Sequence, residues 1–165
     1  MTFSKICIYG AGAIGGWIGA RVARRPNVQL SVVARGDTLS ALQQHGLRLH
    51  SGEQMLQASV KTSANPSELG VQDLIVIAVK APALHDVASH IAPLIGPQTV
   101  VLTAMNGVPW WFLQGFGGAY ANTPLKSVDP DGAIAKGIAA EHVMGCVVHA
   151  SCSLRGPAQV QHHFG

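Results

Sequence analysis

The sequence predicts an α/β fold with a doubly wound, mostly parallel sheet, and three observations favour this class. A continuous apolar run over Asp73–Val79 is typical of a central strand that is buried on both faces. Short apolar runs alternate along the chain with segments of helical periodicity. Hydrophobic residues make up 48% of the 165 residues and charged residues only 12%, which excludes a disordered chain and predicts one well-buried domain over residues 1–165.

The first predicted strand, Lys5–Tyr9, runs directly into a glycine-rich motif. The motif has the pattern G-x-G-x-x-G and comprises Gly10, Ala11, Gly12, Ala13, Ile14 and Gly15. Between a strand and a helix, this pattern is typical of Rossmann-like dinucleotide-binding folds, in which it permits a tight turn, a close approach to a pyrophosphate and close helix packing. The first N–H groups of the helix then face the phosphates. The alternative is an ordinary glycine-rich turn.

The helix that follows is predicted over Ala13–Arg25. Ile14, Ile18 and Val22 recur at helical spacing, so we expect them to face the sheet with Trp17 beside them. A Pro-Asn pair ends the helix.

The second predicted strand, Val28–Ala34, ends at Arg35, twenty residues after Gly15. At this place an acidic residue binds the ribose 2′-OH of NAD, whereas an arginine accommodates the 2′-phosphate of NADP. A guanidinium can hold a phosphate through two parallel hydrogen bonds. We therefore predict NADP as the cofactor, with Arg35 as a ligand of its 2′-phosphate; the alternative is a solvated loop arginine. Asp37 is expected to cap the next helix.

That helix is predicted to end at His45, with Gly46 as its C-terminal cap. The alternating segments Leu47–Leu49 and Gln57–Val60 predict a hairpin. The same patterns predict strands over Asp73–Val79, Thr99–Thr103, Val143–Ala150 and Gln159–His162, and helices over Ala83–Ile95 and Gly132–Ala140. The stretch 108–131 contains an aromatic cluster and several glycines and is predicted as a loop.

Four predicted strand ends carry residues suited to ligand binding: the glycine motif, Arg35, Lys80 and Asn106. Ligands of open α/β sheets bind beyond the carboxyl ends of the strands. We therefore expect a phosphate cradle, two cations and an amide on one rim. Taken singly, a lysine such as Lys80 is more often a solvated residue and an Asn-Gly pair such as Asn106-Gly107 is more often a turn.

Composition and motifs exclude several other classes. The net charge of +3 comes from scattered basic residues, so no nucleic-acid partner is expected. No apolar run approaches 18 residues, which predicts a cytoplasmic protein without a membrane partner. Three cysteines without a C-x-x-C motif are expected to be free thiols. The eight histidines lack metal-ligand spacing, so no metal is expected, and the G-x-S-x-G and H-E-x-x-H motifs of hydrolases do not occur.

Three segments together resemble the ketopantoate reductase (2-dehydropantoate 2-reductase) family: Gly10–Gly15, Val79–Ala81 and Ala104–Val108. The resemblance implies NADPH-dependent reduction of a small-molecule 2-oxo acid, 2-dehydropantoate, to pantoate in pantothenate biosynthesis. It also implies that the glycine motif holds the pyrophosphate, that Lys80 lies near the cofactor, and that Asn106 lies near both the nicotinamide ribose and the substrate.

The sequence departs from the family pattern at its C-terminal end. Family members carry a second, mostly helical domain, which contributes the lysine taken as general acid and an acidic residue that binds the substrate hydroxyl. This sequence stops at Gly165, about where that domain should begin, and Lys126 and Lys136 lie in the wrong segment for the role. Since general acid catalysis contributes about 10²–10⁴-fold in rate, we expect a fragment that binds NADP with little or no turnover.

Two other functions stay open. One is a stand-alone NADP-binding or interaction module without catalysis. The other is a reductase of another 2-oxo acid, because the aromatic stretch Pro109–Phe112 could shape a different pocket. The surface that should meet the second domain is expected to be apolar and bare, which predicts a homodimer or aggregation.

Overall fold

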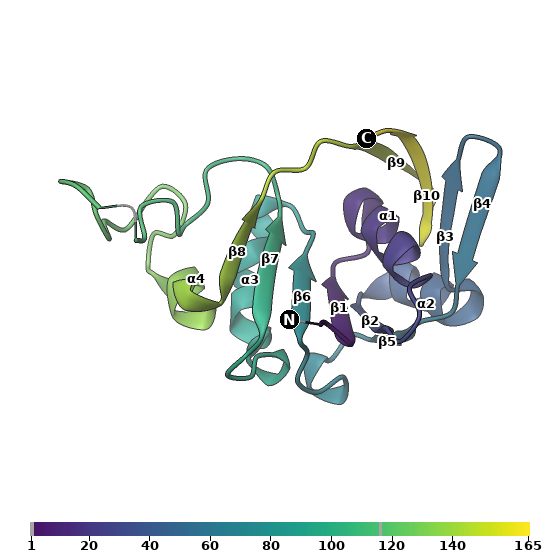
Figure 1. Cartoon of the computed structure of the whole chain (residues 1–165), viewed down its shortest axis with the longest axis horizontal. Helices are drawn as coiled ribbons and strands as arrows, with labels where there is room; N and C mark the ends of the chain where they lie inside the picture. Colours follow the sequence, from purple (N-terminus) through teal and green to yellow (C-terminus); the bar gives the residue numbers. More distant parts are fainter. Residues whose placement is uncertain (1, 116) are drawn as a thin grey trace.

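The computed structural model describes residues 2–115 and 117–165, and its central feature is a six-stranded sheet (Figure 1). Its strand order is β5–β2–β1–β6–β7–β8, and every pairing in it is parallel. Counted within this sheet, the order is the 3-2-1-4-5-6 arrangement of doubly wound Rossmann-like folds. The predicted fold class is therefore confirmed.

Five strands of the central sheet lie where the apolar runs predict them, with their ends trimmed by a few residues, whereas no strand was predicted over Lys61–Ser63. The six strands are β1 (Lys5–Tyr9), β2 (Gln29–Val33), β5 (Lys61–Ser63), β6 (Leu74–Ile77), β7 (Val100–Ala104) and β8 (Val143–Cys146). In β1, Ile6 and Ile8 belong to one hydrophobic cluster, whereas Cys7 and Tyr9 belong to another. Because successive side chains of a strand point to opposite faces, both faces of the sheet are covered.

Helices pack on both of these faces. They are α1 (Ala13–Val22), α2 (Gly36–His45), α3 (Leu84–His90) and α4 (Ala133–Gly137), with short 3-10 turns η1 (Pro66–Glu68), η2 (Ala81–Ala83), η3 (Ala92–Leu94) and η4 (Ala140–His142). Residues of α1 and α2 join the cluster of Ile6 and Ile8, and residues of α3 and α4 join the cluster of Cys7 and Tyr9.

The helices are shorter than the sequence patterns predict. The single helix expected over Ala83–Ile95 is divided into α3 and η3, since Pro93 lacks the N–H group that a continuous helix needs, and η2 precedes α3. The helix expected over Gly132–Ala140 ends at Gly137. Asp37 lies in the first turn of α2 and not at its N-cap, which is Arg35, so the predicted capping role is wrong.

A second, four-stranded sheet lies beside the first, in the order β4–β3–β10–β9. Its strands are β3 (Leu47–Ser51), β4 (Gln54–Ala58), β9 (Ser151–Gly156) and β10 (Gln159–Phe164). The predicted hairpin is confirmed as the antiparallel pair β3–β4. Strand β10 pairs in parallel with β3 and antiparallel with β9. Strand β9 was not predicted, and the strand expected over Val143–Ala150 ends at Cys146.

Helix α1 lies between the two sheets, and this position explains its small residues. Its buried residues are Gly15, Gly16, Gly19 and Ala20. A Cβ on Gly16 would lie 2.7 Å from Val160 Cγ2 of β10, and one on Gly19 would lie 2.9 Å from Leu47 Cδ1 of β3 and 3.2 Å from Ile8 Cγ1 of β1. The expected apolar stripe of the helix packs around this contact and stays partly exposed, so the prediction that its large side chains form the buried face is only partly right.

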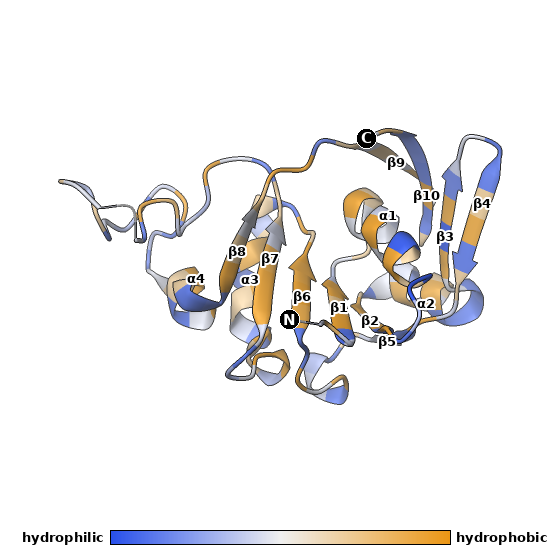
Figure 2. Cartoon of the chain, in the orientation of Figure 1, coloured by the Kyte–Doolittle hydropathy of each residue, from blue (hydrophilic) through white to orange (hydrophobic). Residues whose placement is uncertain are grey.

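Apolar residues concentrate in the central sheet, and polar residues dominate β10 and the outer ends of the β3–β4 hairpin (Figure 2). Across the part of the chain that the structure describes, no helix combines the length and the apolar character needed to cross a membrane.

Candidate functional site

In the turn from β1 into α1 the backbone packs so tightly against its neighbours that two positions, Gly10 and Gly15, must be glycine. Gly10 has φ +97°, a conformation that side chains strongly disfavour, and its N–H donates to the Val33 carbonyl oxygen at 3.0 Å. A Cβ on Gly15 would overlap the carbonyl oxygen of Gly10 and lie 3.0 Å from the Ala78 Cβ. These two glycines therefore let the helix approach the strand.

Gly12 differs, because nothing in the protein requires it to be a glycine. Its φ of −73° suits any residue, and no atom lies within 4 Å of the position that its Cβ would take. Gly12 is the N-cap of α1, which has neither a side-chain cap nor an acidic residue in its first turn. The open space lies where helical N–H groups lack partners within the helix, an arrangement suited to phosphate.

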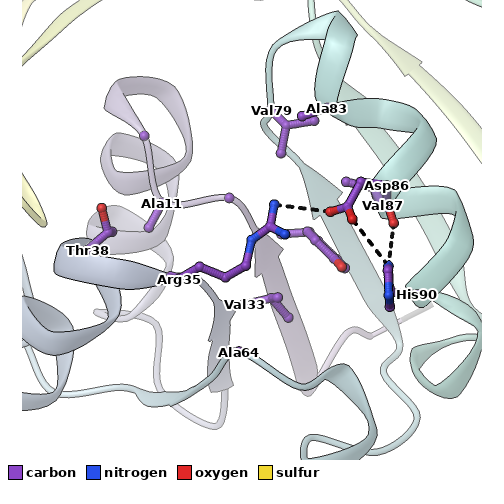
Figure 3. Close-up of a pocket in the computed structure, with 14 residues that line it drawn as sticks. Ala11, Val33, Arg35, Thr38, Ala64, Val79, Ala83, Asp86, Val87 and His90 are labelled. Atoms are coloured by element: carbon purple, nitrogen blue, oxygen red, sulfur yellow. Dashed lines mark hydrogen bonds and ion pairs between the residues drawn. The ribbon is translucent and has the colours of Figure 1, made fainter.

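A cleft of about 380 Å³ opens beside this turn (Figure 3). Its walls come from the ends of β1 and β2, the first turn of α2, and α3. The lining residues are Tyr9, Gly10, Ala11, Gly12, Val33, Ala34, Arg35, Thr38, Ala64, Val79, Ala83, Asp86, Val87 and His90. Four of the predicted site residues thus line one cavity: Gly10, Ala11, Gly12 and Arg35.

The other predicted residues lie elsewhere. Ala13, Ile14 and Gly15 form the first turn of α1 behind the cleft. Lys80 is exposed at the N-cap of η2 and does not line the cavity. Asn106 follows β7 and lines a separate cavity. The common rim expected from the sequence therefore divides into two cavities in this structure.

Arg35 projects into the cleft from the start of α2 and pairs with an acidic residue across it. Its Nη2 lies 3.1 Å from Asp86 Oδ2, with 68% of the arginine side chain and 42% of the aspartate side chain exposed (Figure 3). Nothing in the sequence singled out Asp86, because an acidic residue in the first turn of a helix is commonly explained by the helix dipole. The fold makes it the partner of the predicted phosphate ligand.

Two further side chains complete the polar character of the cleft. His90 Nδ1 lies 2.8 Å from the backbone oxygen of Asp86 and 3.6 Å from Asp86 Oδ1. Burial, and secondarily the negative charge of Asp86, raises the pKa of Tyr9 above its usual value. Tyr9 therefore stays protonated at neutral pH and keeps an O–H group that can donate a hydrogen bond.

A larger cavity of about 730 Å³ adjoins the ends of β7 and β8. Its lining is mostly apolar and includes Trp110, Trp111 and Phe112 from the loop that the sequence predicted, together with Asn106 and Cys146. The two tryptophans are packed into the fold, since Trp110 is only 4% exposed and a Cβ on Gly145 would lie 2.6 Å from the ring of Trp111, whereas Phe112 is exposed.

The side chain of Asn106, which follows β7, forms hydrogen bonds with the segment that follows β8. Its amide nitrogen donates to the Val148 carbonyl oxygen at 3.2 Å, and its amide oxygen accepts from the Val148 N–H at 2.9 Å. An amide has two N–H groups and two oxygen lone pairs, so these two bonds leave it able to form others. Asp129, which is 4% exposed, accepts from the N–H groups of Ile134 and Ala135 and so caps α4.

Among the described residues, no group of three or more histidine, cysteine or acidic side chains could hold a metal ion. The cysteines Cys7, Cys146 and Cys152 are free thiols, as expected.

The strand order and the glycine turn at the start of α1 place the chain in the Rossmann-like class of α/β proteins. A sequence comparison identifies the family within this class: the model of the ketopantoate reductase PanE/ApbA family matches residues 6–110. The chain belongs to this family.

Individual relatives agree with this assignment. A 2-dehydropantoate 2-reductase of Mesorhizobium japonicum is 44% identical over 161 residues, which cover 98% of this chain and 49% of that protein. A 2-dehydropantoate 2-reductase of Lactococcus lactis is 32% identical over 106 residues, or 63% of this chain and 34% of that protein. The chain thus spans half or less of the length of these relatives.

Solved structures show the same pattern. A protein of Ralstonia solanacearum described as a ketopantoate reductase superimposes with a TM-score of 0.94 at 48% identity, covering 99% of this chain and 50% of that one. A D-mandelate dehydrogenase solved with NADH and anilino(oxo)acetate shares the fold, with a TM-score of 0.73 at 23% identity.

Proposed function

We propose that this chain is the cofactor-binding part of a cytoplasmic, NADPH-dependent 2-dehydropantoate 2-reductase that acts in pantothenate biosynthesis. The observation that carries the proposal is the cleft in which the open space at Gly12, the uncapped start of α1 and Arg35 lie together. Relatives at 44% and 32% identity that carry this enzyme's name support the reaction.

Each part of the cleft has a distinct role in this proposal. The backbone of Gly10–Gly15 receives the pyrophosphate, because Gly12 leaves room for close approach and the first N–H groups of α1 supply donors. Arg35 binds the 2′-phosphate. The cofactor supplies the hydride, while the protein supplies orientation and charge. Lys80 and Asn106 are proposed to act at the nicotinamide end, with Asn106 also contacting the substrate.

A binding experiment tests the cofactor assignment. NADPH and NADH are titrated into the chain and followed by fluorescence, with Arg35→Gln as the test variant and Arg155→Gln, on exposed β9, as the matched control. We expect tighter binding of NADPH, lost in Arg35→Gln and kept in Arg155→Gln. Equal affinity of the unaltered chain for the two cofactors would refute the role of Arg35.

We further propose that the chain alone binds cofactor but turns over little 2-oxo acid. The described cavities contain no lysine among their lining residues that could serve as a general acid. Lysine and acidic residues for this step are expected in the part of the relatives that this chain does not span. Reduction of 2-dehydropantoate by the chain at a robust rate would contradict this proposal.

A second candidate function is favoured by the 730 Å³ cavity. Its lining by Trp110, Trp111 and Phe112 suits a 2-oxo acid with a bulkier apolar side chain than that of 2-dehydropantoate. In the presence of NADPH, 2-dehydropantoate and phenylpyruvate are titrated in parallel while tryptophan fluorescence is recorded. Tighter binding of the aromatic acid would favour the second function.

We also propose self-association through exposed apolar side chains. The candidates on the loop over 108–131, β8 and the following segment are Val108, Phe112, Tyr120, Met144 and Val147. Exposed apolar side chains that gather into one patch usually mark interaction sites. Light scattering that finds a monomer at high concentration would contradict a homodimer.

A further inference from the structure

The guanidinium of Arg35 forms an ion pair with Asp86 inside the cleft. The two residues come from opposite walls: Arg35 from the start of α2 and Asp86 from the first turn of α3. Figure 3 shows the guanidinium and the carboxylate directed toward each other, with 3.1 Å between Nη2 and Oδ2. Both side chains line the same 380 Å³ cavity.

The charges of the cleft balance. Among its lining residues, Arg35 is the one lysine or arginine and Asp86 is the one aspartate or glutamate. A phosphate that enters this cavity therefore meets a cation whose charge is already compensated. A ligand without a phosphate at this position does not need to separate the pair.

We propose that Asp86 sets how strongly the cleft prefers a 2′-phosphorylated adenosine over an unphosphorylated one, by competing with the 2′-phosphate for Arg35. The proposal rests on the proposed function, since it takes the cleft as the adenosine end of a dinucleotide site. Asp86 is a specificity-determining residue in this account and acts through Arg35.

The direction of the effect follows from the geometry. A carboxylate and a phosphate both bind a guanidinium through parallel hydrogen bonds, so they draw on the same N–H groups. Removing the negative charge of Asp86 frees Arg35 for the 2′-phosphate, and NADPH should then bind more tightly. NADH lacks this group, so its affinity should change little.

The size of the effect is limited by the exposure of the pair. Ion pairs between side chains as exposed as these two are weak, because water screens them. We therefore expect Asp86→Asn to increase the ratio of NADPH to NADH affinity about three- to fivefold.

The experiment measures dissociation constants by calorimetry for the 165-residue chain and its variants. The ligands are NADPH and NADH, together with 2′,5′-ADP and 5′-AMP, which differ by the 2′-phosphate and probe the adenosine end alone. The variants are Asp86→Asn, Asp86→Ser, Arg35→Gln and the double variant Arg35→Gln/Asp86→Asn. Glu53→Gln, at the exposed tip of the β3–β4 hairpin, is the matched control.

Tighter binding of NADPH and 2′,5′-ADP by both Asp86 variants, with NADH and 5′-AMP unchanged, is the expected result. Glu53→Gln should match the unaltered chain for all four ligands. In the Arg35→Gln background the gain from Asp86→Asn should fall below about twofold, because the contested guanidinium is gone.

Three outcomes would overturn the proposal. Weaker binding of all four ligands by the Asp86 variants would show that the carboxylate contacts the ligand directly. An equal gain with and without Arg35 would show a general charge effect. An unchanged ratio in variants that melt like the unaltered chain would show that the pair is irrelevant to selectivity. If the unaltered chain binds none of the four ligands, the proposed function fails as well, whereas normal binding with an unchanged ratio rejects only the role of Asp86.

Discussion

Replacing Gly12 and Gly15 by alanine, one at a time, separates ligand binding from folding within a single turn. Gly12 has an ordinary backbone conformation and open space around its Cβ position, so Gly12→Ala should fold normally. The substitution restricts the unfolded chain, which favours folding by about 0.4–1 kcal/mol, but alanine is a poorer N-cap than glycine, so we expect the two effects to offset each other and Tm to change little. The added methyl group, however, stands where the pyrophosphate is proposed to approach, and NADPH affinity should fall at least about tenfold, or ~1.4 kcal/mol.

Gly15→Ala should behave in the opposite way. Its methyl group would overlap the Gly10 carbonyl oxygen and press on Ala78, so α1 must move away from β1. Overpacking of this kind costs roughly 1–3 kcal/mol. For a domain of this size, each kcal/mol lowers Tm by about 2–4 °C. A loss of about 4–8 °C is therefore expected for a cost of about 2 kcal/mol.

The assay pairs thermal unfolding by circular dichroism with NADPH titration for both variants. Gly16→Ala is a useful comparison, because its methyl group would meet Val160 on the side of α1 that faces the second sheet. It should lower Tm without a direct effect on phosphate binding. Full NADPH affinity in a well-folded Gly12→Ala variant would refute the phosphate cradle, and an unchanged Tm in Gly15→Ala would refute the packing argument.

Three further outcomes are expected. Asp73 accepts three hydrogen bonds from Ser4 and Lys5, which lower its pKa below the usual value of an aspartate. Asp73→Ala should therefore destabilise the protein by on the order of 1 kcal/mol at pH 7. A carboxyl group whose pKa is lower in the folded than in the unfolded protein stabilises the fold above its unfolded pKa, and this stabilisation is lost as the pH falls. The free energies of unfolding of Asp73→Ala and the unaltered chain, measured in urea, should therefore converge below about pH 4. A constant difference down to about pH 2 would contradict this expectation. Cys7 is fully buried, and burial raises the pKa of its thiol to about 11. A thiol reagent should therefore label only Cys146 and Cys152 in the folded protein, and Cys7 only after urea is added. Labelling of Cys7 without urea would disprove its burial. Asn106→Ala removes both hydrogen bonds to Val148 and should lower Tm by several degrees, because each kcal/mol of lost stability lowers Tm by about 2–4 °C. An unchanged Tm would show that these hydrogen bonds contribute no stability.

Local patterns were sufficient to predict most of the central sheet. The run Lys5–Tyr9 and the glycine motif predicted β1 and the start of α1 at the residues where they occur. The Gly46 cap was also predicted well, because φ of +69° there is a local property of the chain. Strand β9 was missed because its alternation is short, with only Cys152 and Leu154 between polar residues, and antiparallel pairing with β10 stabilises it as a strand.

The site was predicted only where a single segment contains it. The glycine turn and Arg35 could be found from spacing, whereas Asp86 could not, since its contact with Arg35 depends on how α3 packs beside β2. Asn106 was expected beside the cofactor on a common rim, whereas in the structure its amide group forms two hydrogen bonds with the backbone of Val148. Contacts between residues that are distant in sequence depend on tertiary packing and leave no periodic signal.

The clamping of α1 between two sheets has a consequence for the order of folding. Gly16 and Gly19 of α1 meet β10 and β3, and β10 is formed by residues 159–164. The helix that opens the cleft is thus fully covered on its outer side only after residues 159–164 have been synthesised. Since pairing over such a separation is slow, a nascent chain that already carries the glycine turn should acquire nucleotide affinity late, when β10 joins β3.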